Sequence, residues 1–256
     1  MIPFFRKIRY GFAMNNQPAS RTGRFLKYSR YAIGEIVLVV IGILIALQIN
    51  EWNDNRLKRN LEVEFLREIN DNLLKDTAKI NEVLEFNKAK VAAIKSMMIW
   101  FEEAKSGDFD LQAFSQQMNI LGTYDKFLPN RTAFDNLLDT ETIGLISNRD
   151  LRTLISKYYK FDFVDGTQKT VQDRTRAFTE TASTHLTTKE NMYGMFGVNL
   201  DLKSSQDTQI FRDEEVITAM VYMSITLSYQ NQLMETTLND LNIILQLIEE
   251  ETEGKY

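Results

Sequence analysis

The sequence predicts an all-α protein: an N-terminal transmembrane helix followed by an extracytoplasmic bundle of three long helices plus short helices. Three observations support this class. Residues 31–49 form one long apolar stretch, YAIGEIVLVVIGILIALQI. Beyond it, apolar residues recur at helical spacing almost throughout. Only three prolines occur in 256 residues, and Pro129 alone follows the stretch, so little interrupts helix formation.

The apolar stretch from Tyr31 to Ile49 is long enough to cross a bilayer. Nineteen helical residues at about 1.5 Å each span roughly 28 Å, close to a hydrocarbon core of about 30 Å. The residues before it include seven basic and no acidic ones, which predicts a cytoplasmic N-terminus. The end of the stretch lacks the paired small residues of a signal-peptidase site, which favours an uncleaved anchor over a signal peptide. We therefore expect a single-pass protein of the inner (cytoplasmic) membrane with a periplasmic C-terminal domain.

This topology divides the chain into three regions. Residues 1–30 form a cytoplasmic basic segment, in which Ile2 to Phe12 is either a short amphipathic helix at the membrane surface or a disordered basic tail. Residues 31–49 form the transmembrane helix, and residues 50–256 the extracytoplasmic helical bundle. Because seven of the 30 basic residues precede the stretch and only one of the 35 acidic residues lies within it, the outer domain is acidic. An acidic domain is a poor nucleic-acid binder, so no nucleic-acid partner is expected.

The first long helix of the predicted bundle runs from Trp52 to about Lys105. Seven-residue spacing marks its packed face, with further apolar residues interleaved: Leu66, Ile69, Leu73, Ile80, Val83, Asn87, Ile94, Met97 and Phe101. We expect Ser106-Gly107-Asp108 to end this helix.

The last helix follows a 3-4 spacing over more than four heptads: Ile217, Met220, Ser224, Leu227, Asn231, Met234, Leu238, Leu241, Leu245 and Ile248. Residues 216–234 carry no charge, so a second membrane span is the alternative. The many Ser, Thr, Asn and Gln residues there favour a buried bundle helix instead.

A third long helix is expected to begin after Ser147-Asn148 and to continue to about Ser183. Gly166 weakens it, and a break at Asp165-Gly166 is the alternative. Shorter helices are expected over Leu111 to Met118 and Arg131 to Leu138.

Two parts of the chain resemble a family of uncharacterised single-span, N-terminally anchored helical proteins of Bacteroidetes. The first part is FFRKIR with YAIGEIVLVVIGILIALQINEWN. The second is the pattern Phe127-x-Pro129, Phe134, Leu138, Ile146, Asn148, Leu151 and Tyr158-Tyr159. Where the family pattern has a glycine-containing turn, this chain has Asp139-Thr140-Glu141-Thr142. The resemblance implies topology and habitat, and it implies no activity.

Catalytic and metal-binding chemistry is not expected. The chain has no cysteine and a single histidine, His185, which excludes thiolate chemistry and histidine-rich metal sites. A lone histidine near a helix end is usually a surface or capping residue. The acidic clusters at Glu102-Glu103 and Glu249-Glu250-Glu251 read as solvated surface, because adjacent residues on a helix do not face each other. We expect no catalytic residue, no metal and no cofactor.

Three residues of the span form a candidate membrane interaction face. An acid inside a span, Glu35, is costly and is a candidate for pairing with a partner helix, although it can also reach the headgroups beside Arg30. Gly42 and Ala46 have the small-x-x-x-small spacing that lets two helices approach closely.

A second candidate surface lies in the long connection from Leu186 to Arg212. Its apolar centre contains Tyr193, Met195 and Phe196, a composition suited to a partner surface. The alternative is that these side chains plug the end of the bundle.

Two functions remain from these observations. The first is a membrane-anchored periplasmic scaffold or accessory protein that acts through protein–protein interaction, without catalysis. Its expected partners are membrane lipid and another membrane or periplasmic protein, or further copies of itself in a homo-oligomer. The second is an extracytoplasmic ligand-sensing helical bundle that signals through a partner protein. A sensor of that type usually returns through a second span, which favours the first function.

Overall fold

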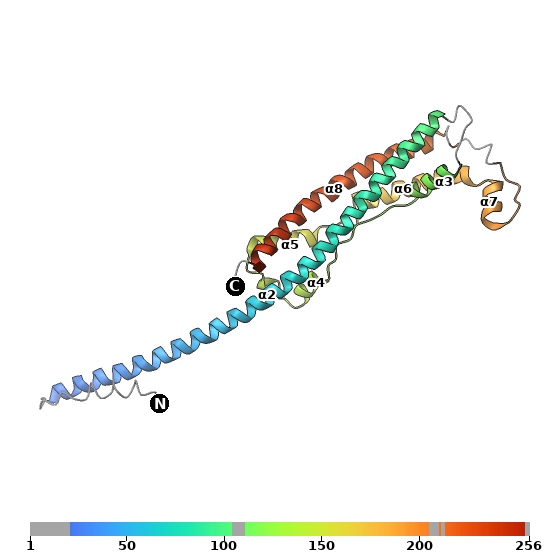
Figure 1. Ribbon diagram of the computed structural model, residues 1–256. Coiled ribbons are helices and arrows are strands. Elements are labelled where there is room, and N and C mark those ends of the chain that lie inside the picture. The colour runs from blue at the N-terminus through green and yellow to red at the C-terminus, as the bar shows by residue number, and fades with distance from the viewer. Residues whose placement is uncertain (1–20, 104–110, 205–209, 211–212, 254–256) are drawn as a thin grey trace. The chain divides into compact units, whose positions relative to one another are not determined.

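A computed structural model describes residues 21–103, 111–204, 210 and 213–253, and every regular element within these ranges is a helix (Figure 1). The all-α prediction is correct to that extent. The chain divides between Arg59 and Asn60 into two compact units. We call residues 60–256 the helical unit. The predicted surface helix over residues 2–12, the helix stop at residues 106–108 and the side chains of Glu102 and Glu103 lie outside the residues described.

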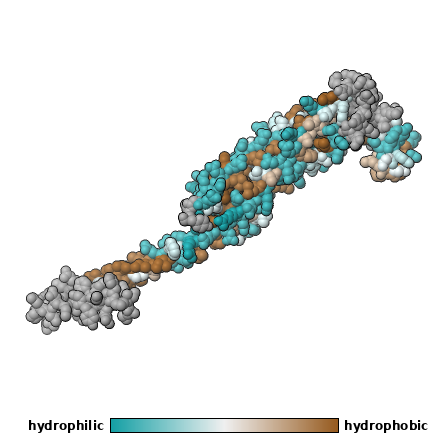
Figure 2. All heavy atoms as spheres, viewed as in Figure 1, coloured by the Kyte–Doolittle hydropathy of each residue, from teal (hydrophilic) through white to brown (hydrophobic). Residues whose placement is uncertain are grey.

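Helix α2 extends from Arg21 to Glu103, so the predicted transmembrane helix and the first long helix are one continuous element. The sequence explains this continuity, because no proline lies within α2 and no glycine follows Gly42 in it. Gly34 and Gly42 each cost about 1 kcal/mol relative to alanine, too little to end a helix of this length. Residues 32–49 are all exposed, and they form an apolar surface (Figure 2).

Within the helical unit, α2 buries the face that the heptad pattern predicts. The predicted positions from Leu66 to Met97 are buried, and Phe101 is half-buried. Asp76 and Lys90 are also buried. They occupy the two positions that complete the 3-4 spacing of this face. The predicted face did not include them.

Helix α8 extends from Glu214 to Glu253, and its buried face is rotated from the predicted one. Met220, Leu227, Met234, Leu241 and Ile248 are buried as expected. The other half of the predicted seam, Ile217, Ser224, Asn231, Leu238 and Leu245, is only half-buried. The positions buried in its place are Val216, Met223, Gln230, Thr237 and Ile244. The prediction was wrong for that half because the two neighbouring rows of α8 are alike in composition: each combines apolar residues with uncharged polar ones.

The expected third long helix is two helices, α5 from Arg149 to Lys160 and α6 from Thr167 to Leu186. The alternative break at Asp165-Gly166 is therefore the correct one. Gly166 has φ 79° and ψ −122°, a conformation that side chains with a Cβ rarely adopt. Asn148 caps α5, as predicted, by accepting hydrogen bonds from the N–H groups of Asp150 and Leu151.

The remaining elements are short. They are α3 from Leu111 to Leu121, α4 from Thr132 to Asp139, the 3₁₀ helix η1 from Ile143 to Leu145, and α7 from Lys189 to Phe196. The first two match the predicted short helices closely. Glu141 has φ 55°, so it lies in the left-handed region that glycine adopts most easily.

Two apolar clusters fill the helical unit. One joins α4 and α5 to residues 66–83 of α2 and to the C-terminal half of α8. The other joins α3 and α6 to residues 93–97 of α2 and to the N-terminal half of α8. Buried polar residues of α2, α6 and α8, among them Asn87, Lys90, Gln168 and Gln230, lie between the two clusters in sequence.

Those polar residues hold residues 123–130, an irregular segment that connects α3 to α4 and that we call the strap. Lys90 Nζ donates to the Thr123 carbonyl, and Asp76 Oδ1 accepts from the Asn130 N–H at 2.8 Å. Fourteen helical residues separate Asp76 from Lys90, about 21 Å. Seven extended residues cover roughly 23 Å. The strap therefore runs antiparallel to α2, and side chains supply partners that its backbone lacks.

Candidate interaction surfaces

The candidate face of the span, Glu35, Gly42 and Ala46, lies on one side of α2. Seven and four residues separate neighbouring members, and all three are exposed. A Cβ built on Gly42 meets no other atom within 4 Å. Among the described residues, α2 is the one helix apolar and long enough to cross a membrane. The structure places these residues together, and their role in association remains a prediction.

Helix α7 forms inside the long connection between α6 and α8. Thr188, fully buried, caps it by accepting from the Asn191 N–H at 3.3 Å. Asn191 Nδ2 donates to the Leu186 carbonyl at 2.8 Å, which ties α7 to the end of α6. Gly197 ends α7 in the left-handed conformation with φ 66°. The Lys189 N–H also donates to the Lys203 carbonyl at 3.1 Å, so both ends of this segment are held.

The apolar side chains of α7 are exposed. Relative exposure is 56% for Tyr193, 72% for Met195 and 70% for Phe196, and Val198 and Leu200 are exposed as well. The alternative that these side chains plug the end of the bundle is therefore wrong. Positions 193, 195 and 196 point to different sides of a helix, so they cannot all face one neighbour. We call Tyr193, Met195 and Phe196 the α7 tip.

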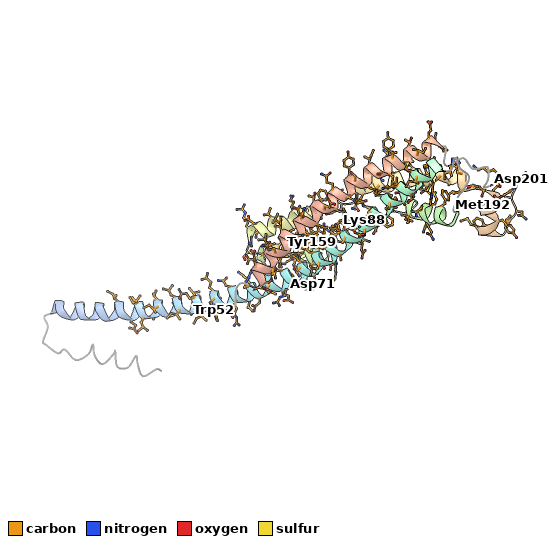
Figure 3. The ribbon with its side chains drawn as sticks, turned by 45° about the horizontal axis from the view of Figure 1, so that its top comes forward. Trp52, Asp71, Lys88, Tyr159, Met192 and Asp201 are labelled. Atoms are coloured by element: carbon orange, nitrogen blue, oxygen red, sulfur yellow. The ribbon has the colours of Figure 1, made fainter. Side chains whose placement is uncertain are left out.

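The α7 tip lies at one end of the helical unit. Met192 and Asp201 mark that end in Figure 3, and Asp71 lies toward the other end. Helices α4 and α5 lie at the end where α2 enters the unit (Figure 1). An ordered helix thus presents three large apolar side chains at the end opposite to α5.

The buried charged groups of the helical unit have structural partners. Burial lowers the pKa of Lys90 to about 7, and its Nζ also donates to Thr175 Oγ1 at 2.8 Å. Burial raises the pKa of Asp76, and two hydrogen bonds oppose that effect: the Tyr158 hydroxyl donates to Oδ2 at 2.7 Å, and the Asn130 N–H donates to Oδ1. These contacts hold the strap and α5 against α2.

The single histidine joins the end of α6 to the start of α8. His185 Nε2 lies 2.6 Å from Asp213 Oδ2, and the histidine side chain is largely buried. This hydrogen bond lowers the pKa of Asp213, and hydrogen bonds from the Glu215 and Val216 N–H groups lower it further. The pair therefore fixes the connection between two helices, close to the capping role expected of His185.

The part of the chain that the structure describes contains no cluster of three or more residues that could hold a metal ion. Two open hollows lie beside α8 in this part of the chain. One, of about 430 Å³, lies between α6 and α8 beside Arg174 and Tyr222. The other, of about 500 Å³, lies between α2 and α8 beside Arg67 and Gln246.

Sequence reasoning missed the residues that hold the strap: Asp76, Lys90, Gln168 and Gln230. A signal for two of them was present, since a charged residue at a seam position of a heptad pattern is unusual. Asp76 and Lys90 both have that position. The strap itself has no periodicity that would reveal it.

Comparison with known proteins adds a family and no chemistry. No curated protein and no solved structure matches this chain. One family model matches residues 35–172, which include most of the predicted span, the buried face of α2, the strap and α5. This match covers more than half of the chain, and the protein therefore belongs to the family of unknown function DUF6090.

Proposed function

We propose that this protein is a membrane-anchored helical scaffold or accessory protein that acts through protein–protein interaction and without catalysis. In this proposal α2 anchors the chain in the inner membrane with its N-terminus in the cytoplasm. The helical unit is then a periplasmic bundle. The basic residues before Tyr31 and the apolar span of α2 support this arrangement.

The α7 tip is the observation on which the interaction rests. Burying one large apolar side chain contributes about 1.5–3 kcal/mol, and three are exposed together on a helix that is capped at both ends. Clustered exposed apolar residues typically mark a binding surface. A preformed helix also costs less entropy to bind than a disordered loop does. Tyr193 and Phe196 are three residues apart and share one side of α7, so a partner that buries these two side chains would gain affinity without refolding the tip.

The location can be tested with single cysteines, because the chain has none of its own. Lys157 is exposed on α5, and a cysteine there should react with a membrane-impermeant maleimide once the outer membrane is opened. A cysteine in place of Ser20 should react only after the inner membrane is broken. The reverse pattern would contradict the proposed topology.

The interaction can be tested with two exposed phenylalanines. Full-length protein is cross-linked mildly in native membranes, and the proteins recovered with it are compared between Phe196→Asp and Phe161→Asp. Phe161 is 50% exposed but lies between α5 and α6, away from α7. We expect Phe196→Asp to abolish recovery of specific partners and Phe161→Asp to retain it. Equal recovery from both variants would refute a role for the α7 tip.

Association within the membrane is a second part of the proposal. Gly42→Ile keeps the span apolar, and a Cβ at this position has no side chain of another turn within 4 Å, so we expect a neighbouring helix to be what opposes it. Val40→Ile, on the opposite side of α2, is the matched control. Gly42→Ile should lower cross-linking between copies or to a partner span, and equal yields would leave the span as an anchor only.

A further inference from the structure

Helix α8 has a second seam of 3-4 spacing, on the side opposite to its buried face. We call it the outer seam. Every member is exposed and none is charged: Thr218, Tyr222, Ile225, Tyr229, Gln232, Thr236, Asn239, Ile243 and Gln246. The unbroken spacing extends over four heptads, the pattern with which one helix packs along another. The core of the helical unit does not use this face.

The N-terminal half of the outer seam is apolar. Tyr222 is 49% exposed, Ile225 46% and Tyr229 59%, and Val221 beside them is also exposed. An exposed helix face in water usually carries charged residues, yet residues 216–234 have none. Burial explains why the inner face of this stretch has no charged residues. It does not explain why the exposed outer face has none.

The charges of α8 itself beside the outer seam are all negative, and Arg174 of α6 is a positive charge beside its N-terminal end. Helix α8 contains eight acidic residues and no lysine or arginine. Glu235 and Asp240 flank the seam on either side, and both are exposed. In a parallel pairing of two copies, which a shared membrane anchor would impose, Glu235 of one copy would lie opposite Asp240 of the other. This like-charge contact would occur twice in a symmetric dimer and disfavours a second copy on this face.

A hollow of about 430 Å³ adjoins the N-terminal end of the outer seam, between α6 and α8. Thr218 and Tyr222 of the seam line it, together with Glu214 and Glu215. The Arg174 guanidinium lies 5.1 Å from the centre of the Tyr222 ring and supports it from α6. Among the described residues, no cation forms an ion pair with Glu214 or Glu215. The hollow can therefore receive a basic side chain beside the apolar seam.

We propose that the outer seam docks an amphipathic helix of a partner protein that has uncharged residues along its own seam and lysine or arginine residues beside it. This inference rests on the proposed interaction function and gives it a partner class. Lysines beside the partner's seam would face Glu235 and Asp240, and one would reach Glu214 or Glu215. An anionic lipid surface is a poor occupant, because α8 offers it only negative charge.

The test uses a designed peptide of four heptads with isoleucine and leucine along its seam and lysine at the flanking positions. A matched peptide has glutamate at the flanking positions. Binding to full-length protein in nanodiscs is measured by fluorescence anisotropy. Ile225→Asp is compared with Ile99→Asp, because Ile99 on α2 is exposed to the same degree, 47%. The double variant Glu235→Lys, Asp240→Lys reverses the flanking charge.

We expect the lysine peptide to bind the parent and the glutamate peptide not to bind. Ile225→Asp should weaken binding at least about tenfold despite adding negative charge, and Ile99→Asp should not. The double variant should prefer the glutamate peptide. Equal binding to the Ile225→Asp and Ile99→Asp variants would overturn the proposal, because general charge attraction would then explain it. Cross-linking of two copies through Ile225 would also overturn it.

Different results would contradict the role of the α7 tip and the role of the outer seam. Phe196→Asp should leave peptide binding unchanged, because the α7 tip is not part of the outer seam. If peptide binding fails while partner recovery still depends on Phe196, the interaction function stands and the inference about α8 falls. If recovery of partner proteins depends on neither the α7 tip nor the outer seam, both proposals are contradicted.

Discussion

The Gln168 side chain forms two hydrogen bonds with the backbone of a single residue, Phe127. Its Oε1 accepts from the Phe127 N–H at 2.7 Å, and its Nε2 donates to the Phe127 carbonyl at 2.9 Å. The amide thus takes the place of a neighbouring strand. Phe127 is itself buried and packs edge-on against the Phe163 ring, with ring centres 5.1 Å apart. An extended segment can lie in a helical core only if such partners exist.

Gln168→Ala should therefore destabilise the helical unit by about 2–4 kcal/mol, because it leaves two buried backbone groups of Phe127 without partners. Gln232→Ala, at an exposed position of α8, is the control and should change stability by less than about 0.5 kcal/mol. Denaturant unfolding followed by circular dichroism measures both. If the two variants unfold alike, the strap does not depend on Gln168.

Lys90 should make the free energy of unfolding depend on pH between about 7 and 10.5. Burial lowers its pKa to about 7 in the folded protein, whereas the unfolded chain keeps the usual value of 10.5. Between these values the unfolded state binds the proton and the folded state does not, so the free energy of unfolding rises with pH across this window. Lys90→Met should remove most of this rise. Parallel stability curves for parent and variant from pH 7 to 10 would contradict this.

Leu241 and Leu238 test the rotation of α8. Leu241 is fully buried, and Leu241→Ala should cost about 2–5 kcal/mol. Leu238 is half-buried, so Leu238→Ala should cost clearly less than Leu241→Ala. Thermal unfolding of both variants gives the comparison. Equal losses would favour the face that the apolar spacing alone predicts.

Gly166 tests the break between α5 and α6. Its φ of 79° is strained for any residue with a Cβ, although a Cβ there meets no atom within 4 Å. Gly166→Ala should therefore destabilise by about 1 kcal/mol through backbone strain alone. Gly144→Ala has equal space and no positive φ, and it should not destabilise. A neutral Gly166→Ala would instead indicate a helix that can continue through this point.

The sequence predicts an element well when apolar spacing and burial coincide. The face of α2 from Leu66 to Met97 is the clearest case. Helix α8 was predicted, but only half of its buried face was, because the predicted row and the buried row beside it both combine apolar with uncharged polar residues. Gln230 and Thr237 of the buried row form hydrogen bonds. Gln230 Oε1 accepts from Asn87 Nδ2 at 2.9 Å, and Thr237 donates to the Leu233 carbonyl at 2.8 Å.

The candidate sites show the same limit. The sequence identified the apolar residues of the α7 tip, but it did not show a helix there, because these residues do not follow a single helical face. Thr188 and Gly197, a capping residue and a helix-ending glycine, were the available signals. The strap gave no signal of its own, because its conformation depends on side chains of α2, α6 and α8.

The most direct test of the proposed function replaces Phe196 with the photoreactive analogue benzoylphenylalanine in the full-length protein in native membranes. The same replacement at Phe161 is the matched control, since both phenylalanines are exposed. The account predicts a discrete cross-linked product from position 196 that contains the same partner in repeated experiments, and none of that product from position 161. Absence of any product from position 196, or identical products from both positions, would contradict the claim that the α7 tip binds a partner.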